Sequence, residues 1–410
     1  MAAPLSAPPI SDPSAIPAPL FNACFVLAVI HAAFFPTAWF AHWWIYGPDG
    51  LGTPTDFVNV WSAGKLALDG HPALAWDWDV QKRIQVDLLG QTFVGHFAWH
   101  YPPPFLFVAA FLAQFPYPVA FIGWALLSLM PYLVAMRAIV GRPFGWLLAA
   151  AFPVVLTNTL VGQNGFLTAS LVGGMLVLLP TRPILSGICL GLLSYKPQYG
   201  LLFPLVLIAA SQWTVFVTAG VVAAAMAAVS WLAFGTESWQ AFFHWLPMFS
   251  QAFLTEGRAP WGKMQSIFAL VRYCGGSETL GWAFQWAMIA AVATALVLLW
   301  RSRARYALKA AALATATLLV TPYLFLYDMM VLAIAVGFLV RIGLSDGFRP
   351  YELPALALMA FLLMFYPLFG APTGFVATLI VASLIAMRCL VPRARFAASA
   401  SPVPLGHPQM

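Results

Sequence analysis

Polar residues are scarce in this chain, and the few that interrupt its apolar segments are the candidates for chemistry. An ionisable side chain is costly in apolar surroundings, about 2.5–3.5 kcal/mol at the middle of a bilayer on insertion scales, so its presence points to a functional site. The candidates form six short runs, at residues 55–57, 100–104, 162–165, 195–198, 263–266 and 321–328.

Asp56 stands directly before FVNVWSAGKLALD (57–69), a stretch with helical spacing of its apolar residues. A carboxylate at a boundary between water and lipid can accept a proton from an incoming hydroxyl group. It can equally serve as the N-cap of the 57–69 helix, because aspartate is a favoured capping residue. Both roles stay open from the sequence.

Three cations are candidates for binding a phosphate group: Lys196, Arg258 and Arg272. Lys196 precedes Pro197, which frees backbone groups in a helix and creates a polar notch. The alternatives are a snorkelling anchor for Lys196 and ordinary loop charges for the two arginines.

Metal chemistry has weak support. Asp77-Trp78-Asp79 resembles the DxD of metal-binding nucleotide-sugar enzymes, but no Gly-rich strand–helix unit accompanies it. His96 and His100 have helical spacing, yet a proline run follows His100 and a third ligand is missing. The four cysteines form no CxxC pair. We therefore expect no metal site and no cofactor.

Composition places the chain in a membrane. Apolar residues make up 62% of its 410 positions and charged residues 8%, with mean hydropathy +0.86, whereas a soluble protein needs roughly 25% charged residues. The net charge of +6 is concentrated in clusters at 301–309 and 388–395, as the positive-inside rule expects of cytoplasmic helix ends. It therefore does not indicate binding to nucleic acid.

A membrane-spanning helix needs about 20 apolar residues. Candidate spans are 20–46, 118–139, 144–161, 164–180, 213–234, 279–300, 307–320, 323–342, 353–370 and 372–388. Segments 103–115 and 184–211 are ambiguous. Either 103–115 spans and 184–211 is one kinked helix, or 103–115 only dips into the membrane and 184–211 makes two short spans. Both readings give about twelve spans in an all-α polytopic membrane protein.

With the basic clusters in the cytoplasm, loops 47–100 and 235–265 lie on the opposite face. Loop 47–100 holds six of the chain's 13 acids, and its 57–69 helix is expected to lie on the membrane surface with Lys65 and Asp69 on its polar face. We expect a single membrane domain over 20–392, between a disordered N-terminal tail (1–19) and a C-terminal tail (393–410).

The runs, taken in order, resemble glycosyltransferase family 87. The resemblance covers roughly residues 50–335. It rests on DFVNVWSAGKLALDGHPALAWD (56–77), YPPPFLFVAAFLAQFP (101–116), GQNGFLTASL (162–171), YKPQYGLLFPLVL (195–207), MQSIFALVR (264–272) and TPYLFLYDMMVL (321–332). The chain departs from the family in having YPPP for YPP, and loop 235–265 offers no second obvious acid.

The resemblance implies a GT-C membrane fold and transfer of a hexose, mannose in known members, from a polyprenyl phosphate to a lipid or glycan acceptor. It implies Asp56 as the catalytic base, acting with inversion on the exterior face of the plasma (inner) membrane. Lys196, Arg258 and Arg272 would hold the donor phosphate. The expected pocket residues are His100, Tyr101, Gln163, Asn164, Gln198, Gln265, Tyr327 and Asp328.

Two other function classes compete with this interpretation. A secondary transporter predicts inverted repeats and paired broken helices in two halves, and the sequence has no such halves. An O-antigen ligase or polymerase predicts a large late loop rich in Arg and His. The basic residues and histidines of loop 235–265 are only His244, Arg258 and Lys263.

Overall fold

The computed structural model describes residues 16–141 and 143–390, and this part of the chain is helical. It contains no β-strand, only an isolated bridge between Tyr46 and Gly52. Most of the two predicted tails lies outside the described residues. The N-terminal tail was predicted two residues too long, because helix α1 (Ala18–Phe40) already begins at Ala18.

Six helical stretches are long and apolar enough to cross a membrane, so a polytopic all-α membrane protein is confirmed. They contain α1, α5 (Tyr117–Val140), α11 (Trp213–Ser250), α13 (Glu278–Arg301), α15 (Met330–Asp346) and α18 (Thr373–Leu390). A bent pair, α6 (Phe144–Ala151) with α7 (Val154–Val161), whose axes differ by 61°, is either a seventh, broken span or a re-entrant loop. The other apolar helices are shorter, so twelve spans remain a prediction.

For 103–115 the structure favours the second reading; for 184–211 it excludes one continuous helix, but both pieces are also shorter than a membrane span. Helix α4 (Leu106–Leu112) and the 3₁₀ turn η3 (Pro103–Phe105) together cover ten residues, about 15 Å of helix, too short for a ~30 Å core. Segment 184–211 is split into α9 (Pro183–Leu192) and α10 (Phe203–Ala209). The break between them contains two 3₁₀ turns, η4 (Leu193–Tyr195) and η5 (Pro197–Gly200), because Pro197 cannot continue a helix.

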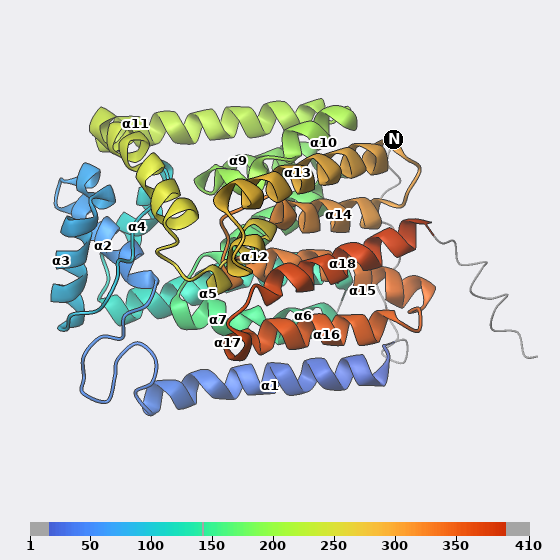
Figure 1. Ribbon diagram of the computed structural model, residues 1–410, viewed down its shortest axis with the longest axis horizontal. Helices are drawn as coiled ribbons and strands as arrows, with labels where there is room; N and C mark the ends of the chain where they lie inside the picture. The colour runs from blue at the N-terminus through green and yellow to red at the C-terminus, as the bar shows by residue number, and fades with distance from the viewer. Residues whose placement is uncertain (1–15, 142, 391–410) are drawn as a thin grey trace, which may run out of the picture.

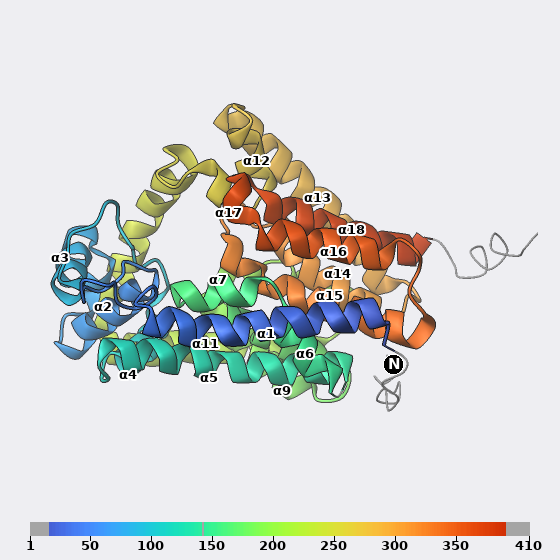
Figure 2. The same ribbon diagram turned by 90° about the horizontal axis from the view of Figure 1, so that it is seen from below.

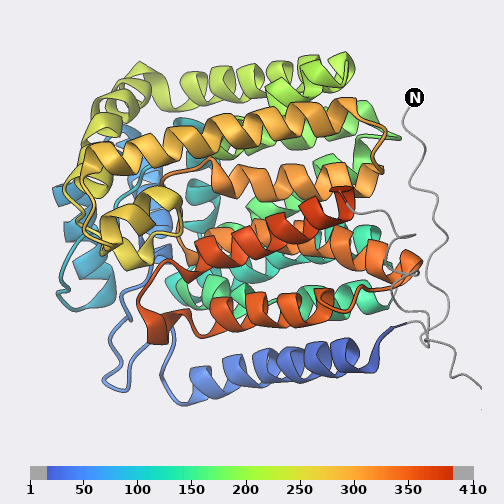
Figure 3. The ribbon, with the colours of Figure 1, turned by 45° about the vertical axis from the view of Figure 1, so that its right-hand side comes forward.

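The remaining helices complete a bundle whose long members run roughly parallel, with α1 along one edge and α11 along the opposite edge (Figures 1 and 3). They are α8 (Gly165–Leu178), α12 (Ile267–Tyr273), α14 (Tyr306–Leu319), α16 (Glu352–Met364) and α17 (Tyr366–Phe369). Helix α15 is apolar on every side and almost entirely buried, which is typical of a helix enclosed by others.

The two ends of the bundle differ in character. Helices α2 (Phe57–Leu68) and α3 (Trp78–Leu89) gather at one end, which we call the loop end (Figures 1 and 2). The opposite end carries the α13–α14 and α15–α16 connections and the end of α18 (Figure 1). We call it the arginine end, because it holds Arg301, Arg303, Arg305, Arg349 and Arg388.

Helix α2 is more enclosed than the sequence predicted. Lys65 and Asp69 do form an exposed ion pair of 2.8 Å. However, eight of the twelve residues of α2 are buried, so the helix does not simply lie on a membrane surface. Gly64 explains the close packing, because a Cβ there would come within 2.0 Å of the carbonyl oxygen of Ala109 in α4. Contacts with α4 therefore fix the position of α2, and Asp56 stands at the start of this helix.

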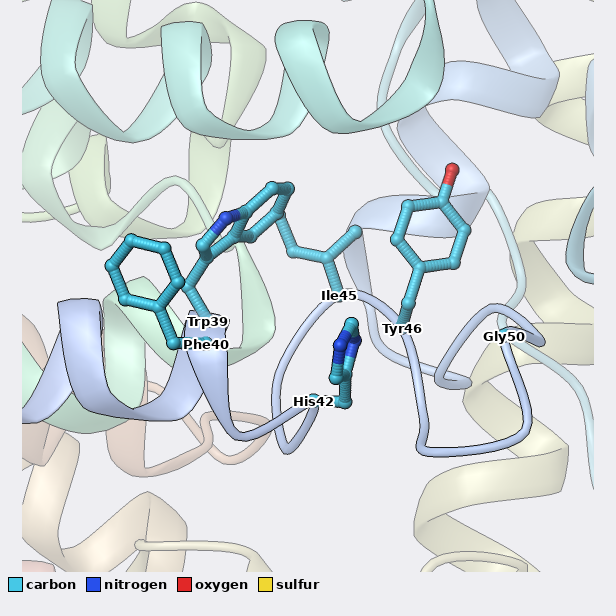
Figure 4. A pocket seen from close by; sticks show the side chains of 6 residues that line it. All are labelled: Trp39, Phe40, His42, Ile45, Tyr46 and Gly50. Atoms are coloured by element: carbon cyan, nitrogen blue, oxygen red, sulfur yellow. The ribbon is translucent and has the colours of Figure 1, made fainter.

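Helix α1 ends in an aromatic patch at the loop end. Phe40 and Trp43 are strongly exposed, and Trp39 and Phe40 line a hollow of about 360 Å³ together with His42, Ile45, Tyr46 and Gly50 (Figure 4). His42 adopts a left-handed backbone conformation (φ 57°), which turns the chain sharply out of the helix. Exposed aromatic rings at a helix end are typical of the boundary between membrane and water.

Candidate active site

Asp56 is placed at the N-cap of α2, but its side chain makes no capping hydrogen bond. Instead its Oδ2 accepts a hydrogen bond of 3.1 Å from Gln163 Nε2. Gln163 in turn accepts from the Tyr101 hydroxyl through Oε1, at 3.1 Å. Three of the sequence-predicted site residues, from segments far apart in the chain, therefore form one hydrogen-bonded line.

Two glycines bring Gln163 and Asn164 to this position. Gly162 ends α7 with a left-handed backbone (φ +67°), and a Cβ there would meet Phe57, the neighbour of Asp56, at 2.6 Å. A Cβ on Gly165 would come within 2.4 Å of the Tyr327 carbonyl oxygen. The GQNG run thus fits between the 56–57 and 327–328 segments only because both ends lack side chains.

The environment of Asp56 makes it a stronger base than an ordinary aspartate. Burial raises the pKa of its carboxyl group to about 6, and the negative charge of Asp328 adds to the rise. The hydrogen bond from Gln163 and the positive charges of Lys263 and Lys196 oppose it. The carboxylate is therefore mostly ionised at neutral pH and is well matched to accept a proton there.

Lys196 and Asp328 form a buried ion pair with Nζ and Oδ1 2.8 Å apart. Each residue is 4% exposed. The other carboxylate oxygen of Asp328 accepts a hydrogen bond from the backbone N–H of Phe325, 2.9 Å away, in the turn that starts α15. This pair joins the Pro197 break to the start of the central helix, and the charge of Lys196 is already balanced.

Aromatic side chains surround the pair. The Lys196 ammonium lies 5.5–6.0 Å from the ring centroids of Tyr101, Tyr199 and Tyr327. His100 stacks on Tyr101 at 4.7 Å. Burial and the positive charge of Lys196 lower the pKa of His100 to about 4, so its imidazole is neutral at pH 7.

Four predicted site residues make no hydrogen bond to this cluster in the part of the chain that the structure describes. Arg258 pairs with Glu256 and lies over the Trp78 ring, and Arg272 donates to the Gly276 carbonyl and lies over Trp261. Gln198 makes no hydrogen bond to another residue that the structure describes. Gln265 binds the carbonyls of Gly262 and Lys263 and accepts from the Gly374 N–H, so it shapes the loop.

Lys263 is a candidate site residue to which the sequence analysis assigned no role. It is exposed, close enough for its charge to act on Asp56, and has no ion pair within residues 16–141 and 143–390. Its backbone is fixed: a Cβ on Gly262 would come within 1.8 Å of the Gly370 carbonyl oxygen, and the Gln265 N–H donates to the Leu324 carbonyl. In the sequence, the indication of a role for Lys263 was its position in the polar run 263–266.

The metal candidates have ordinary structural roles. Asp77 accepts from the N–H groups of Asp79 and Val80 and so caps α3. His96 packs on the Trp78 ring rather than pairing with His100. Over the described ranges, no group of three or more His, Cys, Asp or Glu side chains is placed to hold a metal ion.

Comparison with known proteins gives one match. A family model described as glycosyltransferase family 87 matches residues 99–322, which is more than half of the chain. The matched region includes Tyr101, Gln163, Lys196 and Lys263, while Asp56 and Asp328 flank it. No curated protein and no solved structure matches the chain.

Proposed function

The chain belongs to glycosyltransferase family 87, and we propose that it transfers a hexose, mannose in the first instance, from a polyprenyl phosphate sugar to a hydroxyl group of a lipid or glycan acceptor. Family membership favours a membrane glycosyltransferase over the transporter and the O-antigen ligase or polymerase. The donor, the acceptor and the roles below are our proposals.

The observation that supports this mechanism is the half-buried Asp56 carboxylate. It accepts a hydrogen bond from Gln163, and burial raises its pKa to about 6. Asp56 takes the proton of the acceptor hydroxyl as its oxygen attacks the anomeric carbon. The bond from that carbon to the phosphate oxygen breaks, and the polyprenyl phosphate leaves as an anion. A phosphate is a good leaving group, so one carboxylate suffices, and a single displacement inverts the anomeric centre.

We assign the leaving phosphate to Lys263 in preference to Lys196, Arg258 and Arg272. Lys263 is the exposed cation near Asp56 whose charge is not already paired, whereas Lys196 is neutralised by Asp328 and Arg258 by Glu256. A preorganised cation stabilises negative charge that develops on the phosphate as the bond breaks. Lys196 and the tyrosines around it then form the fixed wall of the pocket.

The proposed orientation follows the distribution of arginines. The arginine end holds Arg301, Arg303, Arg305, Arg349 and Arg388, and the positive-inside rule assigns such an end to the cytoplasm. The loop end with Asp56 then faces the exterior side of the plasma membrane. Donor lipid and acceptor would meet there, without a nucleotide-binding domain.

A direct test compares sugar donors. The protein is purified, placed in proteoliposomes and supplied with polyprenyl phosphate mannose or with a nucleotide sugar of the same hexose. We expect transfer to an added glycolipid acceptor only from the lipid-linked donor. Equal transfer from the nucleotide sugar would refute the proposed donor class. Mass spectrometry of glycolipids from a deletion strain, searched for a precursor that lacks one sugar, identifies the natural acceptor.

The pH dependence of transfer should follow the ionisation of Asp56. Because only the ionised carboxylate accepts a proton, kcat/KM should be constant above pH 7 and fall as the pH drops through about 6. Gln163→Leu removes a hydrogen bond that favours the ionised form, so it should move the inflection to higher pH. An inflection near pH 4 in both proteins would contradict the assignment.

Lys263→Met should lower kcat by about 10²–10³, the usual cost of removing one preorganised group that stabilises transition-state charge. Because Lys263 is exposed and unpaired in the described chain, the unfolding transition should not change. Lys65→Met is the matched control, since Lys65 is also an exposed lysine of the loop end but pairs with Asp69. Unchanged kcat in Lys263→Met would remove Lys263 from the phosphate site.

A further inference from the structure

An apolar groove lies away from the candidate active site. Helices α13, α14 and α18 line a space of about 620 Å³, and its lining includes Ser302, Arg303 and Leu390 at the arginine end of the bundle. Small side chains leave the room for it, among them Ala295 of α13, Ala312 and Ala316 of α14 and Ala386 of α18. No residue of the proposed sugar-transfer site lines it.

The depth of the groove matches one leaflet of a bilayer. Its lining begins at Val292 on α13 and reaches Ser302, the residue directly after the helix; ten helical steps of 1.5 Å separate the two, about 15 Å. The hydrocarbon core of a bilayer is about 30 Å thick, so the groove extends from one surface to the midplane. An acyl chain of a lipid in that leaflet has the same extent.

The mouth of the groove is positively charged. Arg303 lines it, and Arg301 precedes it by two residues. Both side chains are exposed, and neither has an ion pair in the part of the chain that the structure describes. Arg305, by contrast, is paired with Asp346. None of the described lining residues carries a carboxylate, so two cations are free to bind an anion at the level of the lipid headgroups.

We propose that this groove binds one anionic glycerophospholipid of the leaflet at the arginine end. One acyl chain lies between α13, α14 and α18, and the phosphate group meets Arg303 and Arg301. The polyprenyl donor is a poorer fit, because its phosphate must react near Asp56, at the opposite end of the molecule. The site is therefore separate from the site of sugar transfer, and only the exclusion of the polyprenyl donor rests on the proposed function.

Native mass spectrometry of the full-length protein in non-ionic detergent tests the site, with phosphatidylglycerol and phosphatidylcholine of the same acyl chains as probes. We expect one phosphatidylglycerol to be retained in preference to phosphatidylcholine. Replacing Arg303 and Arg301 by alanine should weaken phosphatidylglycerol binding by about fivefold for each arginine, the effect of roughly 1 kcal/mol per cation near anionic lipid. Phosphatidylcholine binding should not change.

Three further variants test the groove and the charge separately. Ala295→Trp should fill the groove and abolish retention of both lipids, whereas Ala287→Trp, exposed on the same helix but outside the groove, should not. Arg182→Ala, another exposed cation that precedes α9, is the charge control. Gel filtration and sugar transfer check that each variant folds. Equal retention of the two lipids, retention of polyprenyl phosphate instead, or a dimer that covers the groove would overturn the proposal.

Discussion

Replacing Asp56 by asparagine is expected to lower the rate of sugar transfer by a factor of about 10²–10⁴ or more, the usual contribution of a general base. The substitution preserves the size of the side chain and leaves an amide oxygen that can accept the hydrogen bond from Gln163. It removes only the ability to take a proton. The loss should therefore fall on kcat, with little change in donor affinity or in the unfolding transition.

The matched control for this variant is Asp77→Asn. Asp77 is an acid of the same loop, and it accepts two backbone hydrogen bonds at the start of α3. Asparagine caps helices as well as aspartate does, so this variant should transfer sugar at the wild-type rate. Proteoliposomes with a labelled lipid-linked sugar give the rates. Full activity in Asp56→Asn would refute the assignment of the base, and a comparable loss in Asp77→Asn would mean that the loop acids act together.

The ambiguity over Asp56 shows where sequence reasoning reached its limit. An aspartate before a helix is compatible with capping and with catalysis, and only the direction of the side chain separates them. That direction depends on Gln163, which reaches Asp56 because Gly162 and Gly165 permit close packing. Local spacing along the chain contains no information about such a contact between distant segments.

The bundle itself was more predictable than the site. Apolar runs predicted the long spans to within a few residues at most ends, as for α5, α13 and α18, because a lipid-facing helix must satisfy its backbone internally. The same reasoning failed where burial inside the protein replaces lipid. Helix α2 was expected on a membrane surface, but Gly64 lets α4 cover it.

The cations were harder to rank from the sequence, because a phosphate site depends on which charges are already paired. Lys196 stood out beside its proline, yet Asp328, 132 residues later in the chain, balances its charge. Lys263 has no such partner among the described residues, and its charge acts on Asp56. Partners this far apart in sequence are found only once the fold is known.

Breaking the Lys196–Asp328 pair is expected to produce the second large effect, on stability. Removing one partner leaves an uncompensated charge at a buried position, which costs about 3–5 kcal/mol. Lys196→Met and Asp328→Asn should therefore each lower the free energy of unfolding by that amount, measured by denaturant titration in detergent. The exposed Lys65–Asp69 pair is the control, since breaking an i,i+4 surface pair costs only about 0.3–0.5 kcal/mol.

The double variant Lys196→Met/Asp328→Asn separates structure from catalysis. It removes both charges, while asparagine can still accept the hydrogen bond from Phe325, so most of the lost stability should return. If Lys196 serves the pocket only through this pair, the transfer rate should also return to within about tenfold of the wild-type rate. This loss is much smaller than the 10²–10³ loss expected for Lys263→Met. A stable double variant that transfers no sugar, beside a fully active Lys263→Met, would instead assign the donor phosphate to Lys196.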